Sequence, residues 1–269
     1  MSGILEVTIL GCGSSGGVPR ADGNWGVCDP ANPLNRRTRC SLLVRRKATD
    51  PAHETTILVD TSPDMVRQSS AAGAKRLDAV LLTHEHADQV HGIDDIRAFA
   101  LRHRRPIPVF MDERCGATMH KRFGYIFENA EYYPAIADSQ PMPASGVVWE
   151  VQGPSGSIPV VGFDQEHGDI TSLGFRFGPV GYSSDVAHLP EESFAALAGV
   201  QVWIVDALRE TPHPTHAHLE RTLEWIWRVR PERAILTNLH VDMDYEALRT
   251  KLPPGVEPAY DGLRFEISL

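Results

Sequence analysis

Short apolar runs in the first half of the chain predict β-strands separated by a few helices. Apolar and β-branched residues are concentrated over residues 5–10, 41–45, 56–59, 79–82 and 107–110, a pattern typical of buried strands. Residues 63–72 follow a Ser-Pro turn and can form a helix. Residues 92–105 carry apolar side chains at helical spacing, acidic residues in the first turn and arginines in the last. This pattern predicts a second helix, which Pro106 ends.

The second half repeats the alternation of strands and helices. Residues 123–146 contain Pro and Tyr without a regular period, and predict a surface loop or lid. Apolar runs then predict strands over 147–151, 158–163, 172–177, 180–183, 202–205, 234–237 and 263–267, and helices over 190–198, 217–229 and 245–251. Because a block of strands and then helices occurs twice, we expect one α/β domain over 1–269, a four-layer αββα sandwich.

Composition and charge exclude several classes of protein. The 269 residues are 42% hydrophobic and carry 26 basic against 35 acidic residues, a formal net charge of -9, which disfavours binding to duplex nucleic acid. No apolar stretch approaches about 18 residues, the length that predicts a membrane span. The first residues lack the basic and apolar regions of a signal peptide. We therefore expect a cytoplasmic protein that does not bind membranes.

Cysteines and histidines direct attention to different chemistry. The four cysteines, at 12, 28, 40 and 115, include no Cys-x-x-Cys pair, which argues against a thiolate zinc site or a disulfide scaffold. By contrast, the chain has 12 histidines, several of them near acidic residues. These clusters point to metal chemistry.

The strongest chemical signal is Thr83-His84-Glu85-His86-Ala87-Asp88, between a predicted buried strand and a predicted helix. Residues i and i+2 of an extended segment point the same way, so His84 and His86 can present two imidazoles to one metal ion. Asp88 would turn toward a neighbouring ion at the helix entrance. Solvated loop histidines are the alternative.

Further residues of ligand type follow later predicted strands: His167, Asp185 and His240. Side chains at strand ends on one edge of a sandwich can converge on a common site. Taken singly, each has an ordinary alternative as a turn residue, a cap or a hydrogen-bonded histidine. Asp60 and Asp206 also end apolar strands.

The order of Asp60, His84-x-His86-x-Asp88, His167, Asp185 and a late histidine resembles the metallo-β-lactamase fold superfamily of dinuclear metal hydrolases. Four further segments are most similar to the phosphoribosyl 1,2-cyclic phosphate phosphodiesterase subgroup. These segments are Gly11-Cys-Gly-Ser-Ser-Gly-Gly-Val-Pro, Asn35-Arg-Arg-Thr-Arg, His91-Gly-Ile-Asp-Asp-Ile-Arg and Tyr260-Asp-Gly.

The resemblance implies a metal-dependent phosphodiesterase for a small cyclic phosphate, of the phosphoribosyl cyclic phosphate or cyclic nucleotide type. Two divalent ions, Zn or Mn, would activate a water that attacks phosphorus. It implies metal ligation by His84, His86, Asp88, His167, Asp185 and a late histidine, and catalytic roles for Asp88 and for His216, with His216 as general acid and substrate contact. Asp60 would support the ligands from behind. A polar helix cap is the alternative for His216.

The sequence departs from the superfamily pattern at two positions. Gln89 stands where a histidine is usual, which weakens the second metal site; His91 could partly substitute for it. The usual late ligand position aligns with Asn238, and His240 lies two residues on. We expect His240 to be the ligand, with Asn238 or a single-metal site as alternatives. Of the subgroup's cysteine-rich zinc loop only Cys28 and Cys40 remain, so no structural zinc is expected.

The spacing Gly11-x-Gly13-x-x-Gly16 matches a dinucleotide-binding motif, but Pro19 and Gly23 replace the helix that should follow. The glycines instead predict a backbone turn beside Arg36 and Arg37, which could bind phosphate; solvated or salt-bridged arginines are the alternative.

Three other functions stay open: a tRNA-processing type of nuclease, a thioester hydrolase of the same fold, and a degenerate binder of small phosphorylated ligands that does not turn them over. The expected partner is a small phosphorylated substrate, and the sequence leaves a homodimer open.

Overall fold

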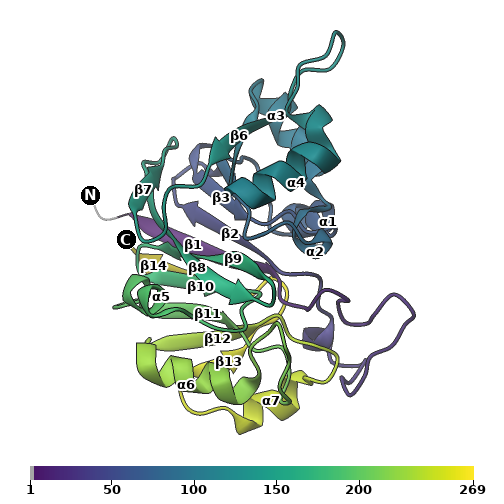
Figure 1. Cartoon of the computed structure of the whole chain (residues 1–269), viewed down its shortest axis with the longest axis vertical. Helices are drawn as coiled ribbons and strands as arrows, with labels where there is room; N and C mark the ends of the chain where they lie inside the picture. Colours follow the sequence, from purple (N-terminus) through teal and green to yellow (C-terminus); the bar gives the residue numbers. More distant parts are fainter. Residues whose placement is uncertain (1–2) are drawn as a thin grey trace.

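In the part of the chain that the structure describes, fourteen strands form two sheets that lie face to face, with helices on both outer faces (Figure 1). The computed structural model describes residues 3–269. The strand order is β14-β1-β2-β3-β4-β5-β6 in the first sheet and β13-β12-β11-β10-β9-β8-β7 in the second. The fold is the four-layer αββα sandwich that the two blocks of strands and helices predict.

The strands of the first sheet are β1 (Ile4–Gly11), β2 (Ser41–Arg46), β3 (Thr55–Val59), β4 (Ala79–Leu81), β5 (Ile107–Met111), β6 (Ala137–Pro141) and β14 (Arg264–Ser268). Those of the second are β7 (Val148–Val151), β8 (Ile158–His167), β9 (Ile170–Phe177), β10 (Val180–Ser183), β11 (Val202–Asp206), β12 (Arg233–Thr237) and β13 (Val256–Pro258). The α-helices are α1 (Met65–Ala71), α2 (Ala87–Val90), α3 (Arg97–His103), α4 (Glu113–Phe123), α5 (Glu191–Ala196), α6 (Leu219–Val229) and α7 (Tyr245–Lys251). Short 3-10 turns are η1 (Pro33–Asn35), η2 (Pro51–His53), η3 (Ile93–Ile96) and η4 (Gly124–Ile126).

The central strands are apolar on both faces because each sheet is covered twice. In β2, Leu42 and Val44 belong to the core between the sheets, whereas Leu43 belongs to the cluster beneath α1–α4. In β11, Ile204 faces the other sheet and Trp203 packs under α5–α7. Alternate side chains of a strand point to opposite faces, so a continuous apolar run serves both layers.

Parallel pairing places the candidate chemistry at one edge of the sandwich. β3 and β4 are parallel neighbours in the first sheet, and β10, β11 and β12 are parallel neighbours in the second. Parallel strands end at the same edge of their sheet. The residues at or just beyond these carboxyl ends are Asp60, His84, Asp185, Asp206 and Asn238.

Two predictions from the sequence are wrong in part. The predicted helix over 92–105 consists of the 3-10 turn η3 followed directly by the α-helix α3, which ends at His103. The predicted loop over 123–146 contains η4 and the edge strand β6, which pairs with β5. The helix α4, whose N-cap Asp112 accepts a hydrogen bond from the Cys115 amide at 2.7 Å, was not predicted.

Two further findings concern the described part of the chain. None of its helices combines the length and apolar character that a membrane crossing requires. Its four cysteines are all buried and free.

Candidate metal centre

Three imidazoles converge where the two sheets meet. His84 and His86 follow β4, and His167 ends β8; one ring nitrogen of each lies within 4.8 Å of the others. His84 Nε2 and His86 Nδ1 are 3.0 Å apart. Two ring nitrogens at this separation either share a proton or face a common cation, and the third nitrogen beside them favours a cation. Three nitrogen ligands with room for a further one are typical of catalytic zinc sites.

A second group of potential ligands shares one of these histidines. His167, Asp185 and His216 also offer ligand atoms within 4.8 Å of one another. Asp185 is 3% exposed, so its carboxylate belongs to the interior of the site and not to the solvated surface. The two groups therefore form one continuous centre.

Hydrogen bonds behind the histidines fix which ring nitrogen faces the centre. Thr83 Oγ donates to Asp60 and lies 2.9 Å from His84 Nδ1, so Nδ1 donates to Thr83 and Nε2 keeps a free lone pair. His167 Nδ1 donates to the Thr215 carbonyl at 2.6 Å, which likewise frees Nε2. Burial, together with the neighbouring histidines, holds the pKa of His84 well below its usual range. His84 is therefore in the neutral form that binds metal ions.

Three residues of the site have left-handed backbone conformations at strand ends. The φ angles are 60° at Asp60, 52° at Asp185 and 61° at Asn238. This region is costly for most side chains, and Asp and Asn tolerate it best. The chain reverses at each strand end and turns the polar side chain into the cluster, at a local cost that is typical of functional sites.

His216 is held by a buried carboxylate. Its Nδ1 donates to Asp206 Oδ2 at 2.9 Å, and Asp206 is fully buried. Burial disfavours the imidazolium, but the charge and hydrogen bond of Asp206, with the charges of Asp185 and Asp88, outweigh it and raise the pKa of His216 to about 9. His216 therefore carries a proton at neutral pH.

Two amide side chains contact the carboxylate of Asp185. Gln89 Nε2 donates to Asp185 Oδ2 at 3.0 Å, and Asn238 Nδ2 donates to Asp185 Oδ1 at 3.3 Å. Both amides are buried. Gln89 and Asn238 stand at the two positions where the superfamily pattern has histidines, so the structure brings both into the centre as donors of hydrogen bonds.

Asp88 and His91 lie at the rim of the centre. Asp88 is half-buried in the first turn of α2, where burial and the charge of Asp185 raise its pKa; it belongs to neither three-residue group. His91 is exposed, and its ring meets Phe123 edge-on at 6.0 Å between centroids. Among the residues described, His91 does not join the ligand groups.

The structure corrects the expectation that His240 is a ligand. His240 Nδ1 bonds to Asp242 Oδ2 at 2.8 Å, and its Nε2 contacts the guanidinium of Arg20. Both ring nitrogens are thus engaged outside the centre. The left-handed turn at Asn238 leaves Asn238 itself at the position of the usual ligand.

The two arginines predicted to bind phosphate, Arg36 and Arg37, have other contacts in the structure. Arg37 is 2% exposed, and its guanidinium donates to the His240 carbonyl and to Asn35, both at 3.4 Å. Arg36 stacks over Trp25 at 5.0 Å. Two other arginines, Arg20 and Arg39, instead line a hollow that reaches Asp88.

Arg20 and Arg39 line a hollow of about 600 Å³ beside the metal centre, together with the turn at Ser15 and Gly16 and with Asp88. We call it the arginine hollow. Arg39 also pairs with Asp64, with Nε and Oδ2 3.0 Å apart. Arg39 belongs to the arginine-rich segment Asn35-Arg-Arg-Thr-Arg, but the sequence does not reveal which arginine of that segment lines the hollow.

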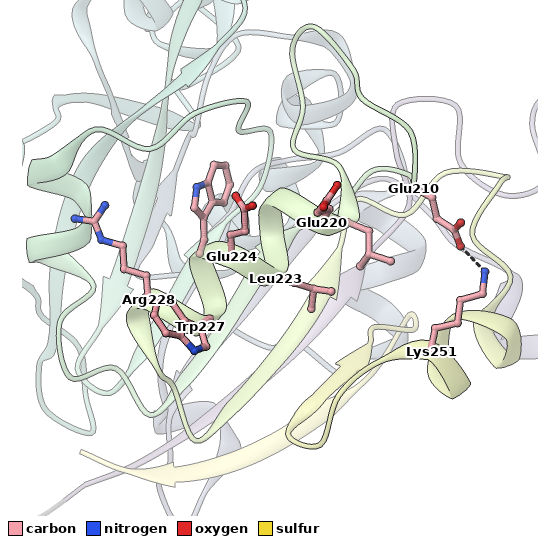
Figure 2. A pocket seen from close by; sticks show the side chains of 9 residues that line it. Glu210, Glu220, Leu223, Glu224, Trp227, Arg228 and Lys251 are labelled. Carbon is pink, nitrogen blue, oxygen red and sulfur yellow. Dashed lines mark hydrogen bonds and ion pairs between the residues drawn. The ribbon is translucent and has the colours of Figure 1, made fainter.

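A larger hollow lies away from the centre, against α6 (Figure 2). Its lining includes Glu210, Glu220, Glu224 and Trp227, and Lys251 is already paired with Glu210 at 2.6 Å. The acidic lining repels an anionic substrate, and none of the candidate ligands contributes to it. The chemistry therefore belongs to the histidine centre.

The sandwich fold and a histidine-aspartate centre at the strand ends define a metallo-hydrolase fold. Residues 55–238 match the family model described as "Beta-lactamase superfamily domain", and the chain belongs to this superfamily.

Several solved structures are similar in fold over nearly the whole length of this chain. One titled "Crystal Structure of a New Diphosphatase from the PhnP Family" is 28% identical with a TM-score of 0.85, covering 100% of this chain and 99% of its own. Zn²⁺-bound PqqB from Methylobacterium extorquens is 18% identical with a TM-score of 0.71, covering 97% and 99%. Human tRNase Z, short form, is 14% identical with a TM-score of 0.64, covering 97% and 98%. The latter two show likeness of fold alone.

A curated relative is a longer protein. An octanoyltransferase of Porphyromonas gingivalis is 30% identical over 264 residues, which are 96% of this chain and 51% of that protein. The chain thus spans about half the length of the curated relative that it matches.

Proposed function

We propose that the protein is a metal-dependent phosphodiesterase that hydrolyses a small cyclic phosphate of the phosphoribosyl or cyclic nucleotide type. The observation that carries the proposal is the convergence of His84, His86 and His167 beside an imidazolium, that of His216. This arrangement combines a site for a cation with a proton donor, and each of them lowers the barrier to breaking a P–O bond.

The residues present fit a divalent ion. Three imidazoles, of which His84 and His167 are oriented by hydrogen bonds from behind, would hold it, with the carboxylate of Asp185 beside His167, and such donors accept Zn or Mn. When bound, the ion supplies a Lewis acid that lowers the pKa of water and withdraws electron density from a phosphoryl oxygen.

His216 is placed to act as general acid. Asp206 engages Nδ1 and thereby orients the ring, so the opposite nitrogen, Nε2, is free to donate a proton to the departing oxygen. A positioned acid contributes about 10²–10⁴-fold to rate. After transfer, the carboxylate of Asp206 remains beside the ring and favours its reprotonation.

The arginine hollow supports an anionic substrate of limited size. Arg20 and Arg39 offer guanidinium donors next to Asp88, and charge-assisted bonds to phosphate oxygens are among the strongest hydrogen bonds in proteins. A ring diester needs no long groove. Arg36, which stacks on Trp25 outside the hollow, is the matched control for substitutions here.

A second candidate is hydrolysis of a P–O–P linkage, favoured by the likeness to a protein whose title calls it a diphosphatase. It needs the same cation, acid and anion-binding groups, with phosphate as the leaving group.

Acyl transfer has less support. An acyl group carried on a thiolate would need an activated cysteine, whereas burial raises the pKa of Cys12, Cys28, Cys40 and Cys115.

The test is a substrate panel with purified, metal-replete protein: cyclic phosphates, linear phosphodiesters, diphosphates, RNA ends and thioesters. We expect the highest kcat/KM for cyclic phosphates, loss of turnover on chelation, and loss of both metal and turnover in His84→Ala. His53→Ala is the matched control, because His53 is exposed, pairs with Asp50 and belongs to neither ligand group. This variant should keep both its metal and its turnover. Turnover of thioesters alone would contradict the proposal, and ligand binding without any turnover would favour a non-catalytic binder.

A further inference from the structure

We propose that this centre binds one divalent ion, and not the pair implied by the superfamily resemblance, because the amides of Gln89 and Asn238 take the place of the second. The inference rests on the proposed metal-dependent function, but its test counts ions instead of turnover.

Both oxygens of Asp185 already have donors of their own. Gln89 Nε2 donates to Oδ2 at 3.0 Å, and Asn238 Nδ2 donates to Oδ1 at 3.3 Å. A carboxylate that bridges two cations must direct a lone pair toward each of them. Here the side of Asp185 that would meet a second cation meets amide N–H groups, which carry partial positive charge and repel a cation.

The surroundings fix which way each amide points. Gln89 Nε2 lies 3.0 Å from Asp185 Oδ2 and 3.4 Å from Asp88 Oδ2. Asn238 Nδ2 lies 3.3 Å from Asp185 Oδ1 and 3.2 Å from Asp206 Oδ2. Turning Gln89 over would set its oxygen against two carboxylate oxygens. Turning Asn238 over would do the same and would gain only His216 Nδ1, which lies 3.2 Å from its Nδ2, so the carboxylates determine both orientations.

The orientation of Gln89 holds even though it leaves Oε1 buried without a hydrogen-bond partner among the residues described. Two carboxylate oxygens lie within hydrogen-bond distance of Nε2, whereas Oε1 meets no donor among the residues described. The amide acts here as a donor to Asp185 and Asp88.

The three histidines present lone pairs, and not N–H groups, to the centre. The rings of His84 and His167 are held from behind through Nδ1, so their Nε2 atoms offer lone pairs, and His86 Nδ1 lies 3.0 Å from His84 Nε2. The centre is thus asymmetric: one position presents lone pairs and the other presents N–H donors. One ion per chain follows.

The first experiment measures metal content after loading with excess Mn²⁺ or Zn²⁺ and dialysis, for the wild type and for Gln89→His/Asn238→His, which restores imidazoles at both positions. Gln201→His adds a histidine at an exposed position as the matched control. We expect about one ion per chain in the wild type and in the control, and about two in the double variant.

The second experiment uses the wild type alone and so does not depend on the folding of a variant. Two Mn²⁺ ions about 3.5–4 Å apart couple magnetically, whereas a single ion gives the paramagnetic resonance spectrum of an isolated centre at every loading. We expect the isolated spectrum throughout.

Two ions per wild-type chain, or a coupled Mn²⁺ spectrum, would overturn the inference. A folded double variant that still holds one ion would also overturn it, because the amides would then not be what excludes the second ion. No bound metal in the wild type would contradict the proposed function itself. One ion in the wild type without phosphodiesterase turnover would leave this inference standing and contradict only the proposed function.

Discussion

Replacing Asp206 with Asn should lower the pKa of His216 and remove its acid function while keeping the site assembled. Asp206 Oδ2 accepts bonds from His216 Nδ1 at 2.9 Å and from the Val186 amide at 3.1 Å. The Asn oxygen can still accept from Val186. The negative charge that favours the imidazolium is lost, however, while burial of the ring remains.

The magnitude follows from the pKa of His216, which is about 9 in the folded protein against 6.5 for a free side chain. Each factor of ten in proton affinity is about 1.4 kcal/mol, so the surrounding carboxylates favour the imidazolium by about 3 kcal/mol. Because the folded pKa is the higher one, this contribution to stability is fully present below pH 6.5 and is lost as the pH rises through 9.

The assay has two readouts. In metal-free protein, NMR titration should place the pKa of His216 in Asp206→Asn at or below 6.5. Urea unfolding should show a wild-type advantage over Asp206→Asn that is up to about 3 kcal/mol larger at pH 6 than at pH 10. In the metal-replete enzyme kcat should fall about 10²–10⁴-fold. An unchanged pKa with unchanged kcat would refute the assignment of His216 as the acid.

Three further predictions test other parts of the account. Arg20→Ala should raise KM roughly tenfold with little change in kcat, since a hydrogen bond to a charged group is worth about 1.5–3 kcal/mol; a fall in kcat alone would contradict a binding role. Thr83→Val should weaken metal affinity about 10–100-fold, measured by calorimetric titration, because it removes the hydroxyl that orients His84; unchanged affinity would contradict this. Burial opposes ionisation of Glu6, but Arg45 and other cations outweigh it and lower its pKa, so Glu6→Gln should cost about 1–3 kcal/mol at pH 7, since Arg45 keeps Glu54 as a partner. That cost should disappear as acid protonates Glu6 in the wild type, and a loss that is independent of pH would argue against the ion pair.

Much of the centre was predictable from strand periodicity. The spacing of His84 and His86 places both on one side of an extended segment, and Asp185 follows the strand β10, whose parallel neighbour β11 ends at the same edge. His167 was expected to follow a strand over 158–163, and in the structure that strand continues to His167 itself. These relations depend on local geometry, which a sequence records.

The misplaced residues depend on contacts between distant segments. His240 lies two residues beyond a left-handed turn at Asn238, and a pattern of spacing does not reveal that turn. The guanidinium of Arg37 is buried and donates to the carbonyl of His240, far along the chain, whereas Arg20 and Arg39 line the arginine hollow.

Errors of fold have local causes. The segment predicted as one helix from residue 92 begins with the 3-10 turn η3 before α3, and apolar spacing does not separate these two kinds of turn over so few residues. The strand β6 has the sequence Ala-Asp-Ser-Gln-Pro at a sheet edge, with little of the apolar alternation that identifies strands.

X-ray absorption of the zinc-loaded protein shows whether three imidazoles hold the divalent ion on which we propose that hydrolysis depends. We expect a shell containing three histidine nitrogens at about 2.0–2.1 Å, reduced by one in His167→Ala together with loss of turnover. A zinc shell without imidazole, or one unchanged in His167→Ala, would contradict this proposal.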